Sequence, residues 1–222
     1  MDFSSQWIYD LLLTAPPLLF SLTVHEFAHA RTALAFGDRT AALMGRCTLN
    51  PLAHLDPLGT ITLLVTRMIG WAKPVPVNPL NLHPRRLGDI CVSLAGPLSN
   101  FLLAILAGLL LRVALAFETS LAASTFHVLF QVLWFSLVAN LGLCVFNLLP
   151  LFPLDGHHIA RELLPIGRHA GFMHWQLRYG RPILMAQIFV PIVLGRTGGS
   201  FPDPIRFVHG RLLDLTLRIV GF

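Results

Sequence analysis

Two histidines and a glutamate near the N-terminus have the spacing of a metal-binding helix. His25, Glu26 and His29 form the sequence HEFAH, which follows the pattern HExxH. On an α-helix, residues four positions apart lie on one face, so His25 and His29 can offer imidazole nitrogens to a single ion. Glu26 stands beside that ion in the pattern, where a carboxylate can act as a general base. The motif therefore predicts zinc chemistry.

A third ligand is needed, because a catalytic zinc site usually has three protein ligands and keeps a fourth position for water. The strongest candidate is Asp155, which follows a long apolar stretch in NLLPLFPLDGHH. A carboxylate at the end of an apolar helix is costly unless it has a partner. His157 and His158 are rival ligands, and a helix-end cap or turn is the simpler alternative for Asp155.

The composition around these residues is that of an integral membrane protein. The 222 residues are 55% hydrophobic and 12% charged, and the mean hydropathy is +0.68. The net charge is +5, but the basic residues are spread along the chain, which indicates membrane topology and no nucleic-acid partner. The three cysteines are far apart and predict neither disulfides nor a thiolate zinc site.

The apolar segments predict an all-α polytopic membrane protein with a core of three transmembrane helices. The first span lies between Asp10 and Arg31 and carries HEFAH. It lacks a cleavage site and should stay in the membrane. Two further long spans are expected at about 88–111 and 126–150.

Two segments between the first and second spans should associate with the membrane without crossing it. Residues 57–70 are apolar but too few for a full crossing, which favours a re-entrant or interfacial segment. Residues 71–87 contain four prolines and should be extended or β-like.

The whole chain, residues 1–222, is predicted to be one integral membrane domain with its core at 6–160. The C-terminal region, 161–222, contains a short apolar segment at 182–194. Its tail, from Ile205 onward, alternates apolar and charged residues as an amphipathic helix at a membrane surface does.

Basic residues predict the orientation of these spans. They are frequent between the first two long spans and again after the third, whereas the connection between the second and third spans has only Arg112 near it. The positive-inside rule places the basic-rich segments in the cytoplasm. Glu26 lies close to the cytoplasmic end of its span, so the site is expected nearer the cytoplasmic face.

Three sequence patterns resemble the site-2 protease family of intramembrane zinc metalloproteases. They are HEFAH at 25–29, AGPLSN at 95–100 and NLLPLFPLDG at 147–156, which match the family patterns HExxH, GxxxN and NxxPxPxLDG. The stretches LNPLAHLDPLGT and GWAKPVPVNPLNL resemble the compact branch without PDZ or CBS domains. The chain departs from the pattern at Phe152, where the family has a proline.

The resemblance implies a role for each matching residue. It implies Glu26 as the catalytic base and three zinc ligands, which are His25, His29 and Asp155. It suggests substrate or transition-state binding for Asn100 and Asn147, although both could simply bond between helices. His54, in NPLAHLDP, could be a further ligand, an autoinhibitory ligand or a gate, and a surface or turn histidine is the simpler interpretation.

The function implied by the resemblance is an intramembrane zinc endopeptidase of a prokaryotic cell membrane, acting on transmembrane proteins within the lipid bilayer. One alternative is a carrier or sensor of divalent metals, which would need ionisable residues along a whole membrane path; here they lie near one face. Another is a membrane-protein-binding relative without catalysis, against which the intact HEFAH and LDG argue.

Overall fold

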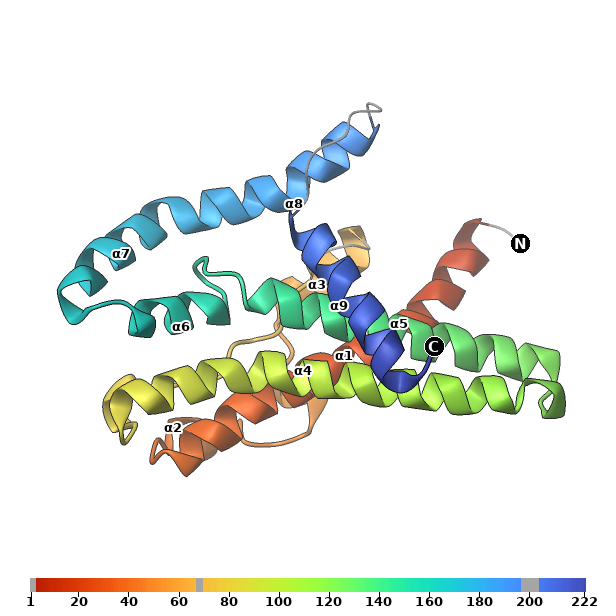
Figure 1. Ribbon diagram of the computed structural model, residues 1–222, viewed down its shortest axis with the longest axis horizontal. Helices are drawn as coiled ribbons and strands as arrows, with labels where there is room; N and C mark the ends of the chain where they lie inside the picture. The colour runs from red at the N-terminus through yellow and green to blue at the C-terminus, as the bar shows by residue number, and fades with distance from the viewer. Residues whose placement is uncertain (1–2, 67–69, 197–203) are drawn as a thin grey trace.

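Three long helices form the centre of the protein (Figure 1). They are α1 (Phe3–Ala35), α4 (Arg85–Ala116) and α5 (Ala123–Asn147). Each is long and apolar enough to cross a membrane by length and composition. The computed structural model describes residues 3–66, 70–196 and 204–222. The described residues therefore show the expected all-α polytopic fold.

Helices α4 and α5 form a close hairpin because small residues line their contact. Ala104 and Ala107 of α4 are buried against Leu137 and Leu141 of α5. Small side chains let two helix backbones approach, which is how helices pack inside membranes. Helix α1 crosses this hairpin diagonally (Figure 1) and contacts both of its helices, α4 more extensively than α5, so α4 is the central helix.

The chain between α1 and α4 contains short helices and extended segments. The short helices are α2 (Thr40–Leu43), η1 (Pro51–Ala53), α3 (Pro57–Thr66) and η2 (Pro79–Asn81). At 10 residues, α3 is too short to cross a membrane. Residues 67–69, part of the predicted re-entrant segment, lie outside the described residues.

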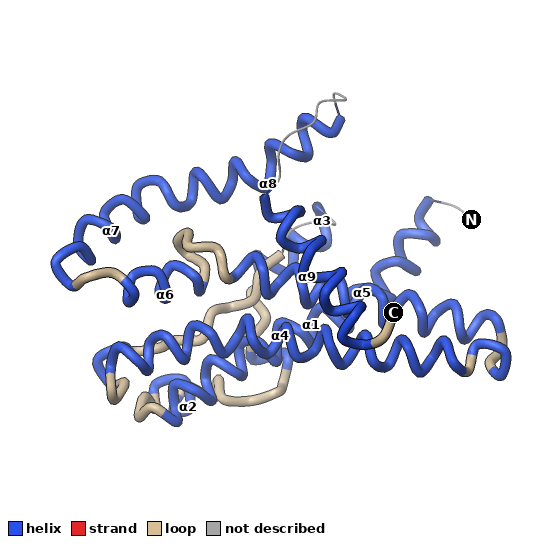
Figure 2. The backbone as a smooth tube through the Cα atoms, viewed as in Figure 1, coloured by secondary structure: helices blue, strands red, loops and turns tan. Residues whose placement is uncertain are grey.

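The predicted β-like character of 71–87 is not confirmed. The described residues contain no β-strand, and residues 71–78 are drawn as loop (Figure 2). Their one pairing is an isolated antiparallel bridge between Leu55 and Ala72. Pro74 and Pro76 have no N–H group to donate, which prevents a continuous ladder. Apart from that bridge, residues 71–78 form no strand pairing.

Asp38 fastens the end of α1 to this extended segment. Its carboxylate accepts hydrogen bonds from Asn78 N (2.7 Å), Asn81 Nδ2 (3.0 Å) and both donors of Thr40. Burial raises the pKa of Asp38, but these hydrogen bonds lower it by more, so the pKa lies below its usual range. The carboxylate is therefore ionised and holds two distant segments together.

The C-terminal region continues from α5 as a series of helices. They are α6 (Asp155–Leu163), η4 (Ile166–Arg168), α7 (His169–Trp175), the π-helical turn η5 (Gln176–Gly180), α8 (Arg181–Arg196) and α9 (Pro204–Val220). The 16 residues of α8 are fewer than the roughly 20 of a crossing helix. Helices α7 and α8 form an arm that extends away from the central hairpin (Figure 1).

Helix α9, which forms the predicted amphipathic tail, packs across α4 and α5. Leu212, Leu213 and Leu217 contact the small-residue cluster between those two helices. Arg112 donates a hydrogen bond of 2.7 Å to Val220 O and so holds the last turn. Part of the apolar surface of the tail is thus covered by the protein itself, whereas Leu215 and Ile219 remain exposed.

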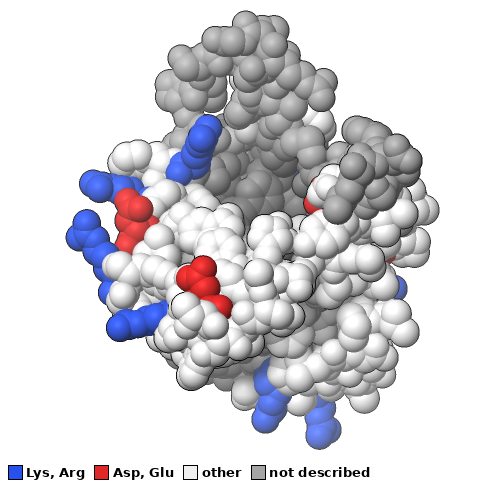
Figure 3. Space-filling model, turned by 90° about the vertical axis from the view of Figure 1, so that its right-hand side faces the viewer, with Lys and Arg blue, Asp and Glu red and all other residues white. Residues whose placement is uncertain are grey.

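Charged groups are sparse where the α4–α5 hairpin turns. Figure 3 faces this end, and the described surface there is mostly uncharged, with Lys and Arg side chains projecting at its edge. The other end of the bundle contains the start of α4 together with α2 and α6 (Figure 1). The basic residues Arg85, Arg86 and Arg161 belong to these elements.

Candidate metal centre

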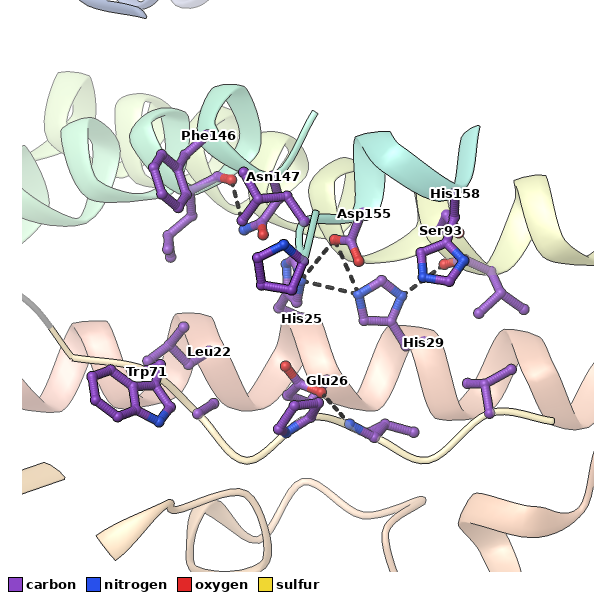
Figure 4. A pocket seen from close by; sticks show the side chains of 18 of the residues that line it. Leu22, His25, Glu26, His29, Trp71, Ser93, Phe146, Asn147, Asp155 and His158 are labelled. Carbon is purple, nitrogen blue, oxygen red and sulfur yellow. Dashed lines mark hydrogen bonds and ion pairs between the residues drawn. The ribbon is translucent and has the colours of Figure 1, made fainter. Parts of the chain in front are cut away.

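Three side chains from α1 and α6 converge on one point (Figure 4). His25 Nε2 and His29 Nε2 lie 3.0 Å apart, and Asp155 Oδ2 lies 3.2 Å from the first and 3.3 Å from the second. The helical spacing of the histidines places them on one face of α1. Asp155 is the first residue of α6, so the turn after α5 carries it back to α1. The described residues thus contain one group of three that could hold a metal ion.

Hydrogen bonds on the far side of each ring orient the two histidines. His25 Nδ1 lies 2.5 Å from Asn100 Oδ1, and His29 Nδ1 lies 2.7 Å from Val92 O. Both partners are acceptors, so each Nδ1 carries the proton and donates it. Each Nε2 then presents a lone pair toward Asp155, which is the tautomer that a metal ligand needs.

The donor set fits a divalent cation. Asp155 Oδ2 is buried and has no hydrogen-bond partner in the described part of the chain. Two imidazole lone pairs and one carboxylate oxygen therefore face one another, and a cation between them would satisfy all three. Nitrogen and carboxylate ligands in this combination suit zinc.

Gly96 leaves room beside the ligand nitrogens. A Cβ atom at this position of α4 would lie 2.4 Å from His29 Nε2 and 2.6 Å from His25 Nε2. Real side chains do not approach so closely, so any larger residue would displace the histidine rings. Gly96 therefore packs directly against the two candidate ligand histidines.

Glu26 lies beside this group on the same cavity. Its Oε2 accepts a hydrogen bond of 2.9 Å from Val75 N in the extended segment (Figure 4). The cavity, of about 400 Å³, is lined by α1, α4, α5, α6 and the extended segment. The cavity therefore brings together the Glu26 carboxylate, the three potential metal ligands and the backbone of the extended segment, between helices that are largely apolar.

The two asparagines suggested by the sequence occupy different positions. Asn147 lines the cavity, and its Nδ2 donates to Leu143 O at 3.0 Å. Asn100 is fully buried behind His25, and its Nδ2 donates to Asn140 Oδ1 at 2.8 Å. This position favours a role for Asn100 in orienting His25 over direct contact with a substrate. Asn140 belongs to the same buried chain of bonds between helices.

The other candidate histidines stand outside the ligand group. His54 is buried, donates from Nε2 to Thr48 O at 2.8 Å and does not line the metal cavity. His157 points toward α7 and stacks on Phe172. Burial and the neighbouring charges of His158 and Arg161 lower the pKa of His157 to about 4, so it is neutral. His158 lines the cavity without joining the three ligand atoms.

An ion pair joins α6, the helix that begins with Asp155, to the central helix α4. Arg161 donates to Asp89 and, at 2.9 Å, to Glu162. The Asp89 side chain is only 4% exposed and the Arg161 side chain 15%. This pairing was not foreseen, although an acidic residue close to an apolar span is a signal that a partner exists.

Gln176 holds the loop that leads to Asp155. Its Nε2 donates to Pro150 O at 2.6 Å, and its Oε1 accepts from Phe152 N at 2.9 Å. The side chain is buried, and both amide groups are used. Nothing in the sequence around Gln176 indicated this contact, because the two segments meet only in the folded chain.

Comparison with known proteins agrees with this geometry. The model of peptidase family M50 matches residues 14–176. "Putative zinc metalloprotease YwhC" of Bacillus subtilis (strain 168) is 44% identical over 177 residues, which make up 79% of this chain and 79% of that protein. "Putative zinc metalloprotease Rip2" of Mycolicibacterium smegmatis is 39% identical over 148 residues, 63% of this chain and 52% of that protein.

A second relative named Rip2, from Mycobacterium tuberculosis, is 35% identical over 146 residues, again 63% of this chain and 52% of that protein. No solved structure matches the chain. The family match contains both HEFAH and Asp155, which are the two parts of the ligand group, and it extends to Gln176. The chain belongs to peptidase family M50, the site-2 protease family of membrane metalloproteases.

Proposed function

We propose that this protein is an intramembrane zinc endopeptidase that hydrolyses peptide bonds in or near transmembrane segments of other membrane proteins. The observation that carries the proposal is the convergence of the three ligand atoms beside Glu26, in a cavity between helices long enough to span a membrane. His25, His29 and Asp155 hold the zinc ion. When bound, zinc lowers the pKa of water and polarises a peptide carbonyl.

Glu26 performs the proton transfers. Its carboxylate takes a proton from the attacking water and passes it to the leaving amine, which is the usual work of a general base that turns into a general acid. Val75 N fixes the position of one carboxylate oxygen, since it donates to Oε2. Asn147 lines the cavity wall, which supports a role for it in binding the substrate near the reacting carbonyl.

The substrate helix must unwind before cleavage, because its carbonyl groups are occupied by its own hydrogen bonds. The extended segment 71–78 forms one side of the cavity and offers backbone groups to an unwound chain, within the limits set by its prolines. Water reaches the site from the cytoplasm, because the ligands lie at the basic-rich end of the bundle.

The test is cleavage of a membrane-spanning substrate by the protein reconstituted in liposomes. Replacement of Glu26 by Gln should lower the rate by about 100-fold or more, since it removes the base. Its zinc content should stay at the wild-type level. Glu118→Gln is the matched control, because Glu118 is exposed at the far end of α4 and should leave the rate unchanged.

Cleavage that persists in Glu26→Gln, or that survives a zinc chelator, refutes the proposal. Zinc accumulation inside the liposomes without any cleavage would instead favour a metal carrier.

A further inference from the structure

A second, smaller cavity lies directly beside the metal cavity. Its volume is about 190 Å³, and it is formed by α1, η1, α3, α5 and the start of the extended segment. The two cavities share five lining residues, which are Leu22, Gly70, Trp71, Ala72 and Leu143. In Figure 4, Leu22 and Trp71 lie at one end of the metal cavity, with Glu26 further along it. A chain in the metal cavity therefore passes the entrance of the smaller one.

The wall of the smaller cavity is apolar. Leucines from α1 and α3 make up much of it. Two threonines also line it, but the hydroxyl of Thr23 donates to Leu19 O at 2.7 Å and that of Thr60 donates to Asp56 O at 2.8 Å. No charged side chain lines this cavity among the described residues. Burial of an apolar group is therefore the favourable interaction that this cavity offers.

His54 closes the smaller cavity and is held in place. Its Nε2 donates to Thr48 O, and its backbone oxygen accepts from Lys73 N at 2.8 Å. Its Nδ1 is a buried acceptor with no partner among the described residues. The bridge between Leu55 and Ala72 adds a second attachment to the extended segment. The wall of the cavity that His54 and Leu55 form is therefore attached to the extended segment at two points.

The size and position of this cavity fit one side chain of a bound peptide. A cavity of about 150 Å³ in another protein binds benzene, so 190 Å³ accommodates a phenyl or isobutyl group. Side chains of an extended peptide point alternately to opposite sides. A substrate whose carbonyl lies at the metal group can therefore direct a neighbouring side chain past Trp71 into this space.

We propose that the cavity beside His54 is a specificity subsite that binds one large apolar side chain, Phe or Leu, of the substrate close to the cleaved bond. This inference rests on the proposed endopeptidase function. His54 and Thr60 are the specificity-determining residues, because they line the smaller cavity and not the metal cavity.

The test uses membrane-spanning substrates that differ at single positions within three residues of the cleaved bond. At one position, Phe or Leu should raise kcat/KM about 10-fold to 100-fold over Ala, which is the usual gain from filling an apolar pocket. Thr60→Phe fills the cavity and should abolish this preference, because kcat/KM for the Phe and Leu substrates falls to the value for the Ala substrate. Thr125→Phe, on the exposed start of α5, is the matched control and should retain the preference.

A second variant tests the subsite independently, in case Thr60→Phe does not fold. Leu55→Ala enlarges the cavity and should shift the preference toward Trp. If the wild-type protein cleaves every substrate but shows no preference at any position, the proposed subsite is refuted and the proposed endopeptidase function is not. An equal loss for the Phe and Ala substrates in Thr60→Phe also overturns it. If wild type cleaves none of them, both proposals fail.

Discussion

Replacement of Arg161 by Ala should destabilise the protein strongly. Arg161 pairs with Asp89, whose side chain is only 4% exposed, so the variant leaves a buried carboxylate whose remaining basic neighbour is His158, at 3.8 Å. Removal of one partner from a buried ion pair typically costs about 3–5 kcal/mol of unfolding free energy. Because the pair joins α6 to α4 and Asp155 is the first residue of α6, zinc binding should weaken as well.

The double variant Asp89→Ala, Arg161→Ala should be more stable than Arg161→Ala alone, because no unpaired charge then remains at Asp89. Unfolding in detergent and competition with a zinc chelator measure the two effects. Arg168→Ala is the matched control: Arg168 is exposed, and its loss should change stability by about 0.5 kcal/mol or less. Equal stability of Arg161→Ala and Arg168→Ala, or a double variant whose loss is the sum of the single losses, would refute the reasoning.

Three other changes test the metal centre and the attachment of the extended segment to α1. Gly96→Ala should lower zinc content while circular dichroism stays helical, because the new Cβ displaces the two imidazoles. Asn100→Leu should weaken zinc affinity about 10-fold to 100-fold in a chelator titration, since His25 loses the acceptor that fixes its ring; an unchanged affinity would argue against that role. The pKa of Asp38 is lowered on folding, so its contribution to stability is complete above the ordinary carboxyl pKa and is lost as the pH falls through the lowered value. Asp38→Asn should therefore unfold with a flatter dependence on acid pH than wild type, and identical acid profiles would contradict this account.

The ligand group could be predicted from the sequence because each of its two parts has a signal of its own that does not depend on contacts with distant segments. The spacing of HEFAH places His25 and His29 on one helix face wherever the helix lies. Asp155 was found by a different argument, the cost of a carboxylate at the end of an apolar helix. The distance of over 100 residues between the two halves does not weaken either signal.

The contacts that hold the ligand group in place could not be predicted from the sequence, because they join segments that are distant along the chain. Gln176 is an ordinary amide in its own surroundings and gains its role only where α7 meets the loop before α6. The prolines of 71–87 agree with the loop at 71–78, but they did not indicate the short helix η2 at Pro79–Asn81 or the start of α4 at Arg85. They also could not show whether a strand partner exists, and the described residues provide only the bridge to Leu55. The tail from Ile205 likewise showed an apolar face without showing that α4 and α5 cover part of it.

Zinc X-ray absorption of the purified protein tests the central claim most directly. We expect one zinc ion per chain with two imidazole ligands at about 2.0–2.1 Å and a carboxylate oxygen at about 2.0–2.2 Å. Replacement of Asp155 by Ala should remove the carboxylate ligand and lower the zinc content. Zinc bound in the same amount and with the same ligands in Asp155→Ala would contradict the assignment of His25, His29 and Asp155 as one metal centre.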